Sequence, residues 1–244
     1  MQPIFQKDFE LTDIYVDRYG RLKPSAILLF AQEVAGMHCT ELCVDSSVLE
    51  KMHLFWAVSR HRVQITRLPR IGETIHVETW PMPTTRVAYP RSMVAYDEKG
   101  NECFRSVTLW VLMDLDTRNM ILPGKSGIVV SGTVRGGELA IPGGLIPKPL
   151  GSQRQRQVCF TDLDRNGHMN NTRYLDWIND LLPSPFHAAN HLKEFTVCYL
   201  SEAKEGQTLT LNWDLPEKNT LQVEALREEG EDHHRVFSAR LIYE

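Results

Sequence analysis

Two kinds of hydrophobic pattern occur in the first half of the chain. Residues 26–31 read Ala-Ile-Leu-Leu-Phe-Ala, which is apolar around the whole circumference of a helix, and Pro24 is typical of a first helical turn. Residues 72–80 (GETIHVETW) alternate instead with the period of two that a half-buried strand shows. We therefore predict a buried helix over residues 24–37, followed by strands.

The predicted strands are close together along the chain. Residues 107–112 (VTLWVL) are β-branched or apolar, and Asp97 to Gly100 supply the turn of a hairpin. One buried helix followed by a run of antiparallel strands implies a sheet wrapped around that helix. The predicted fold class is α+β.

The same order of segments occurs twice. Residues 17–22 (DRYGRL) match residues 164–169 (DRNGHM) at an offset of 147, and each copy leads into a helix-like segment, 23–38 in the first copy and 170–182 in the second. Further on, residues 62–80 match residues 196–214, with Gly72 aligned on Gly206. A period this long indicates duplication of a whole domain rather than a solenoid.

The duplication predicts three parts of the chain. We place a first repeat at residues 1–120, a linker at 121–155 and a second repeat at 156–244. The linker is rich in Gly and Pro (VRGGELAIPGGLIPKPLG), which is typical of a surface connection without its own core.

The two repeats differ where chemistry is expected to lie. Asp164 aligns with Asp17, so an aspartate at this position can serve the structure of both repeats. At three other positions the two repeats have different kinds of side chain. The second repeat has Asn166, His168 and Glu202 where the first has Tyr19, Arg21 and Leu68. This contrast indicates a functional site in the second repeat.

The spacing of these residues supports a shared site. Asp164, Asn166 and His168 are two residues apart, so in extended chain they point to one side. We expect the second helix to begin directly after them, capped by Asn170 or Asn171, with free amides that stabilise a developing oxyanion. Taken singly, each residue also has a structural interpretation, as a turn former or a capping side chain.

Residues 162–178 (DLDRNGHMNNTRYLDWI) resemble the signature of the plant-type acyl-acyl carrier protein (acyl-ACP) thioesterase family, in which Asp-x-Asn-x-His-x-Asn-Asn runs into a helix. ETWP (78–81) and LWVLMDLDTR (109–118) look like strands of its N-terminal half. The resemblance implies a tandem double hotdog fold, and hydrolysis of fatty acyl-ACP to free fatty acid without a cofactor or metal. It also implies four catalytic residues: Asp164, Asn166, His168 and Glu202.

One departure from the family restricts the mechanism. Plant members follow the glutamate with a cysteine, but here the position is Ala203, which has no nucleophile. We interpret Cys198 as a buried thiol. Two schemes stay open: activation of a water molecule by Glu202 or His168, and direct attack by Asp164 to give an anhydride.

The first repeat lacks these polar groups but contains the more apolar helix. We predict that this helix (24–37) and its sheet form the acyl-chain pocket, with Trp56, Phe30 and Val34 as candidate lining residues. Bulky substitutions at Ala31 or Ala35 should then shorten the preferred acyl chain.

Composition and charge exclude several classes of function. The 244 residues carry a formal net charge of −4, without the positive field of a nucleic-acid or membrane binder. No apolar run approaches the ~20 residues that cross a bilayer, and no phosphate-binding glycine loop or metal-ligand spacing is present. The N-terminus lacks a leader pattern and the five cysteines lack CxxC pairing, which predicts a cytoplasmic protein with reduced thiols.

The expected partner is an acyl carrier protein with a phosphopantetheine-linked acyl chain. Such a carrier is strongly acidic, so basic residues should dock it. Candidates by charge alone are Arg67, Arg70, Lys148, Arg154 and Arg156. A homodimer is compatible with the sequence. The alternatives are an acyl-CoA thioesterase or a hydratase on the same fold, and a non-catalytic acyl-thioester binding protein, which would have little reason to bury four polar groups.

Overall fold

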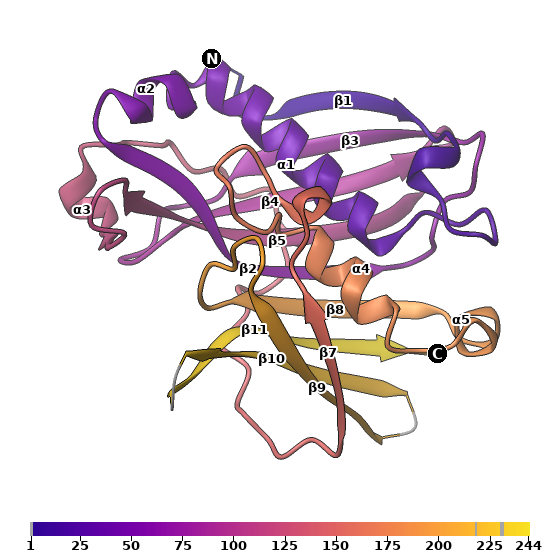
Figure 1. Cartoon of the computed structure of the whole chain (residues 1–244). Helices are drawn as coiled ribbons and strands as arrows, with labels where there is room; N and C mark the ends of the chain where they lie inside the picture. Colours follow the sequence, from indigo (N-terminus) through magenta and orange to yellow (C-terminus); the bar gives the residue numbers. More distant parts are fainter. Residues whose placement is uncertain (1, 218, 230–231) are drawn as a thin grey trace. The chain divides into compact units, whose positions relative to one another are not determined.

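The computed structural model describes residues 2–217, 219–229 and 232–244. The chain divides into two compact units, Met1–Pro142 and Gly143–Glu244, which are described in turn (Figure 1). Among the described residues, none of the helices is both long enough and apolar enough to cross a lipid bilayer.

The first unit contains one long helix and an antiparallel sheet. In chain order its elements are β1 (Phe5–Glu10), η1 (Asp13–Tyr15), α1 (Pro24–Glu41), α2 (Ser46–Glu50), β2 (Leu54–Ile65), β3 (Thr74–Pro81), β4 (Tyr89–Asp97), β5 (Glu102–Asp114), β6 (Met120–Ile121) and α3 (Pro123–Ser126).

The second unit repeats this order with a shorter main helix. Its elements are β7 (Ser152–Gln157), η2 (Phe160–Asp162), α4 (Arg173–Asn179), α5 (Ser184–Ala189), β8 (Leu192–Tyr199), β9 (Thr208–Glu217), β10 (Thr220–Glu229) and β11 (Asp232–Tyr243).

The strands of the two units are ordered in the same way. In the first unit the order across the sheet is β1-β3-β4-β5-β2, with the short β6 paired to the end of β5. In the second it is β7-β9-β10-β11-β8. Apart from β6, each strand of one unit therefore has a counterpart in the other, and all these pairings are antiparallel. The α+β fold class predicted from the sequence is confirmed.

Helix α1 is buried because nearly all of its first half is apolar. It contacts β1 and β3, and the Phe30 ring lies 4.4 Å from that of Phe9 on β1 and 5.0 Å from that of Tyr15. The predicted helix over residues 24–37 is confirmed and extends to Glu41. The hairpin turn at Asp97–Gly100 is confirmed too, since the Gly100 amide donates to the Asp97 carbonyl at 2.9 Å.

Helix α4 follows the corresponding turn of the second unit and packs on its sheet. The Tyr174 ring packs 4.8 Å from Phe237 on β11 and 5.5 Å from Tyr199 on β8. Trp177 is fully buried, and its indole nitrogen donates to Asp162 at 3.3 Å. This helix is shorter than the predicted segment 170–182, because the chain turns at Leu181 and Leu182 before α5 begins.

The segment between the repeats is attached to the sheet of the first unit along residues 131–142. Its described residues between α3 and β7 form neither helix nor strand. The Thr133 amide donates to the Pro81 carbonyl at 2.8 Å, and the Arg135 guanidinium lies 4.7 Å above the Trp80 ring and forms an ion pair with Glu78. This part of the linker is therefore a surface connection that is held on the sheet of the first unit.

Candidate active site

The predicted site residues begin in a tight turn that joins η2 to α4. Leu163 and Met169 form a bridge across this turn, and the Asp164 amide donates to the His168 carbonyl at 2.8 Å. Gly167 has a φ of 76°, a conformation that costs a residue with a Cβ about 1–2 kcal/mol. The glycine therefore allows the chain to reverse directly before His168.

Asp164 holds the turn together through its carboxylate. Its Oδ1 accepts from the amides of Asn166, at 2.8 Å, and His168, at 3.3 Å. In the first repeat, the Asp17 Oδ1 accepts from the amides of Tyr19 and Arg21 at 2.8 and 3.0 Å. Because the two aspartates make the same bonds, these contacts build the turn in both repeats.

His168 and Glu202 lie side by side in the second unit. His168 Nε2 is 3.1 Å from Glu202 Oε2. The two segments are joined by a bridge between His168 and Lys204, and by a bond of 2.8 Å from the Met169 amide to the Ala203 carbonyl. Residues distant in the sequence are thus held in contact by backbone hydrogen bonds.

The pair combines a buried imidazole with a carboxylate that water reaches. The His168 side chain is 11% exposed, whereas that of Glu202 is 39% exposed. The carboxylate can accept a proton from water, and the adjacent imidazole can hold or pass that proton. This arrangement fits general acid–base catalysis.

The first repeat has the same backbone framework without the pair. Arg21 bridges to Arg70, and the Leu22 amide donates to the Pro69 carbonyl at 2.8 Å, which reproduces the contacts of the second repeat. This register places Leu68 where Glu202 lies, as the sequence alignment predicts. Arg21 turns back to its own turn, with Nη2 2.9 Å from Asp17.

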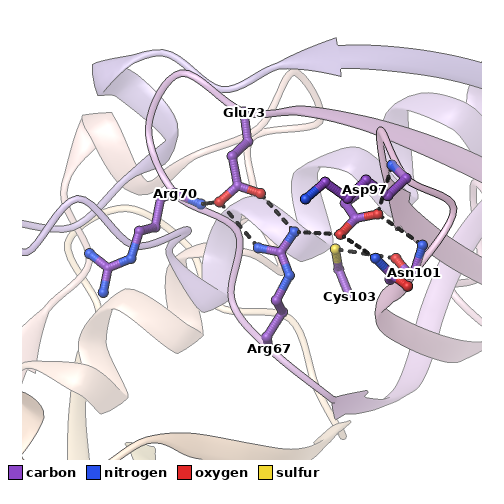
Figure 2. A network of polar contacts seen from close by, with 7 residues as sticks. Arg67, Arg70, Glu73, Asp97, Asn101 and Cys103 are labelled. Carbon is purple, nitrogen blue, oxygen red and sulfur yellow. Dashed lines mark hydrogen bonds and ion pairs between the residues drawn. The ribbon is translucent and has the colours of Figure 1, made fainter.

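A charged network occupies the neighbouring loops of the first repeat (Figure 2). Arg67 donates to both oxygens of Glu73, at 3.1 and 2.7 Å, and to Asp97 at 3.1 Å. Hydrogen bonds, first of all from Asn101, lower the pKa of Asp97 to about 2, and the bond with Glu73 raises the pKa of Arg67. These residues connect the β2–β3 loop to the β4–β5 hairpin.

Two predicted features differ from the structure near the turn. The Asn166 side chain is exposed, and within the described structure its amide contacts Asp164, at 3.4 Å, rather than the His168–Glu202 pair. Helix α4 begins only at Arg173 and has Thr172 as its N-cap. The expected caps are wrong in position, because Asn170 Oδ1 accepts from the Thr172 amide, at 3.0 Å, within the preceding turn.

The amides at this helix start bear on the expected oxyanion site, which stays a prediction. The Arg173 amide donates to the Asn170 carbonyl at 2.9 Å, and the Thr172 amide to Asn170 Oδ1 at 3.0 Å, so these two amides are already bonded within the turn. The helix spans seven residues, which gives it only a short run of aligned peptide dipoles.

Two residues near the pair did not emerge from the sequence. Arg227 on β10 donates to the Glu202 carbonyl at 2.5 Å. Tyr174 is almost fully buried, which raises its pKa, and the charges of Asp164 and Glu202 raise it further. The repeat alignment could have indicated Arg227. It aligns Arg227 with Asp97, the hairpin aspartate that binds Arg67 in the first repeat.

Cysteine and metal chemistry are not built into the described site. Ala203 is fully buried, and the Cys198 thiol lies 3.9 Å from the Gly143 carbonyl, where it is also buried. The described part of the chain contains no group of three or more His, Cys, Asp or Glu side chains placed to hold a metal ion.

The first unit contains a cavity of about 380 Å³. Its lining is mostly apolar and includes Ala35, Val44, Trp56, Tyr89 and Trp110. Of the residues named for an acyl-chain pocket, Trp56 and Ala35 line this cavity. The other candidates, Phe30, Val34 and Ala31, pack within the buried core instead.

The fold and the repeated turn define a protein class, the tandem hotdog proteins. Two solved structures share the fold over nearly the whole chain. An acyl-ACP thioesterase from Bacteroides thetaiotaomicron has a TM-score of 0.89 at 23% identity, covering 99% of this chain and 98% of that one. The 12:0-ACP thioesterase from Umbellularia californica has a TM-score of 0.84 at 21% identity, covering 100% and 98%.

Family models identify the particular group. The acyl-ACP thioesterase N-terminal domain matches residues 2–122, and the C-terminal domain of the same family matches residues 150–239. The chain belongs to the acyl-ACP thioesterase family.

Curated relatives of the family are longer than this chain. A palmitoyl-acyl carrier protein thioesterase from Gossypium hirsutum is 23% identical, covering 89% of this chain and 56% of the relative. A dodecanoyl-[acyl-carrier-protein] hydrolase from Umbellularia californica is 28% identical, covering 84% and 58%. Both are described as chloroplastic, and the chain spans a little over half the length of each.

Proposed function

We propose that the protein hydrolyses the thioester bond of fatty acyl-ACP and releases free fatty acid. The observation that carries the proposal is the contact between His168 and Glu202, 3.1 Å apart, in the repeat that matches the family's C-terminal domain. The first repeat has the same backbone bonds but Arg21 and Leu68 at these positions, so the pair is specific to one copy.

The geometry suggests a role for each member of the pair. Glu202 is the more exposed, and its carboxylate takes a proton from water as the water oxygen attacks the thioester carbon. The carbon–sulfur bond then breaks, and His168 returns a proton to the departing phosphopantetheine sulfur. Asp164 positions His168 through the turn, and Arg227 positions the backbone of Glu202.

The test is hydrolysis of acyl-ACP by Glu202→Gln and His168→Ala. Each variant should lose about 10²–10⁴-fold in kcat, the usual contribution of a positioned acid or base. Glu205→Gln is the matched control, because Glu205 is an exposed carboxylate in the same loop and should leave kcat unchanged. Near wild-type turnover in both site variants would refute the assignment.

Two further arms define the chemistry. Acyl-CoA and acyl-pantetheine of the same chain length compare the carriers, and the proposal expects acyl-ACP to give the highest kcat/KM. Rapid quenching followed by mass spectrometry searches for an acyl group on the peptide that contains Asp164. Such an adduct would replace direct water attack by an anhydride intermediate.

We further propose that the first-unit cavity holds the acyl chain. Its volume of about 380 Å³ lies within the ~300–1,000 Å³ typical of small-molecule pockets, and its lining is mainly apolar. Ala35→Leu should shift hydrolysis toward shorter chains, because the added side chain enters the cavity. An unchanged product-length profile in a folded Ala35→Leu variant would exclude this cavity as the acyl site.

A further inference from the structure

One phenol of the second unit, that of Tyr174 on α4, is buried without a hydrogen-bond partner among the described residues. Only 3% of the residue is exposed. The core seals the hydroxyl of Tyr243 completely, but it does not seal that of Tyr174. A buried polar group without a protein partner requires an explanation, and a ligand that completes its hydrogen bonding is one.

Tyr174 is held between the two segments that carry the His168–Glu202 pair. Its ring packs edge to face against that of Tyr199, at 5.5 Å, and against that of Phe237, at 4.8 Å. Tyr199 is paired with Phe237 and lies three residues before Glu202, while the turn with His168 leads into α4. The ring is therefore fixed at the end of β8, where the chain enters the Glu202 loop.

The charged groups of the candidate site surround this phenol. Burial raises the pKa of Tyr174, and the charges of Asp164 and Glu202 raise it further, while Arg227 acts in the opposite direction. Arg227 also donates to the Glu202 carbonyl, so these groups form one cluster. The phenol keeps its proton at neutral pH, and in that form it can donate a hydrogen bond.

The proposed hydrolysis requires such a donor. When water attacks the thioester, an electron pair of the carbonyl group moves onto its oxygen, and a donor that is already in place stabilises this oxyanion. The Thr172 and Arg173 amides at the start of α4 are already bonded to Asn170, at 3.0 and 2.9 Å. The Tyr174 hydroxyl is not engaged in this way.

We propose that Tyr174 is a further catalytic residue, whose hydroxyl donates a hydrogen bond to the oxyanion of the tetrahedral intermediate. The water oxygen bonds to the thioester carbon as Glu202 takes one proton of the water, and the phenol keeps its own proton throughout. The electron pair then returns to re-form the carbonyl, the carbon–sulfur bond breaks, and His168 protonates the sulfur. This inference rests on the proposed function.

The first test is hydrolysis of acyl-ACP by Tyr174→Phe, which removes the hydroxyl and keeps the packed ring. The kcat should fall about 10²–10³-fold, the usual loss for one oxyanion donor. The free energy of unfolding should change little, because the hydroxyl has no described protein partner.

Tyr199→Phe is the matched control in the same aromatic cluster. The Tyr199 hydroxyl donates to the Asn171 carbonyl at 3.0 Å, so its removal breaks a buried bond. This variant should lower the free energy of unfolding and leave kcat near that of wild type. The two variants thus move stability and kcat in opposite patterns.

A pair of ligands separates an oxyanion donor from a residue that only shapes the site. One is a difluoroketone analogue of acyl-pantetheine, whose hydrate resembles the tetrahedral intermediate. The other has a methylene group in place of the carbonyl. In calorimetry, Tyr174→Phe should weaken binding of the ketone by about the same factor as kcat and leave binding of the methylene compound unchanged.

A structure of the wild-type protein with the ketone gives an answer even if Tyr174→Phe does not fold. The phenol oxygen should lie about 2.5–3.0 Å from the oxygen of the tetrahedral carbon. A phenol without this contact would overturn the proposal.

Three further results would overturn the proposal: wild-type kcat in folded Tyr174→Phe, an equal loss of affinity for both ligands, or a loss of kcat in Tyr199→Phe as large as in Tyr174→Phe. Failure of the proposed function has a different signature. In that case the wild-type protein itself hydrolyses no acyl-ACP, whereas failure of this inference leaves an active wild-type enzyme.

Discussion

The variant Asp164→Asn tests whether Asp164 stabilises the turn or takes part directly in the reaction. The structure gives Asp164 the same backbone contacts as Asp17 in the repeat that lacks the His–Glu pair. An asparagine keeps one carbonyl oxygen, which can still accept from the amides of Asn166 and His168. We therefore expect Asp164→Asn to retain kcat within about tenfold of wild type, since the main bonds survive and each is worth about 0.5–1.5 kcal/mol.

The alanine variant sets the scale for losing the turn. Asp164→Ala removes both amide bonds, at a cost of about 1–3 kcal/mol, and lets the backbone before His168 relax. If that cost falls on the catalytic geometry, kcat falls about 5- to 150-fold. Asn should thus lie close to wild type and Ala clearly below it.

The assay is steady-state hydrolysis of acyl-ACP, with unfolding of each variant followed by circular dichroism. Asp17→Asn is the matched control: it alters the equivalent turn of the first repeat and should leave kcat unchanged. If Asp164→Asn folds normally but loses roughly four orders of magnitude or more, Asp164 acts directly in the chemistry, as an attacking carboxylate would, and the structural interpretation is refuted.

Two further predictions concern stability. Gly36 lies on the exposed side of α1, and a Cβ there would meet no atom within 4 Å. Gly36→Ala should therefore raise the free energy of unfolding in urea by about 0.5–1 kcal/mol. A destabilised variant would contradict this reasoning. Burial lowers the pKa of His61 to about 3, below its usual ~6.5, so the unfolded state binds more protons between these values and stability should fall as the pH drops from about 6.5 toward 3. His61→Gln should flatten that dependence, and an unchanged slope would exclude His61 as its source.

Local patterns in the sequence predicted the parts of the fold that depend on local physics. The burial of helix α1 was predicted from a run of residues that is apolar on all sides, unlike the run of an amphipathic helix. Pro24 marks its first turn. The turn at Asp97–Gly100 follows from residue preferences within four positions. The second helix was predicted too long: α4 begins only at Arg173 and ends at Asn179, and Leu181 and Leu182 continue the chain as turns.

The sequence predicted which residues form the candidate site, but it did not predict how their side chains are arranged. The repeat comparison identified His168 and Glu202 together, and the structure places them 3.1 Å apart. It also identified Asn166, whose side chain the structure leaves at the exposed tip of the turn. Alternate positions along an extended chain share a side, but a glycine with positive φ at position 167 breaks that rule.

The basic residues predicted to dock the acyl carrier protein also show what sequence analysis cannot predict. Arg67, Arg154 and Arg156 were chosen by charge alone. Arg67 is bound by Glu73 and Asp97, while Arg154 and Arg156 donate to Asp180, each at 2.7 Å. Charge counts are a property of the sequence, but whether a charge is available to a partner depends on neighbours that only folding supplies.

The sequence alone determined the duplication, the α+β class and the repeat that carries the polar set, because these depend on residue identity and periodicity. Only the tertiary structure decided which groups meet. Arg227 reaches the Glu202 carbonyl from a strand 25 positions away, and Arg91 reaches His38 across 53 positions. Contacts of this kind depend on sheet register and helix packing, which many distant side chains set together, so no local pattern records them.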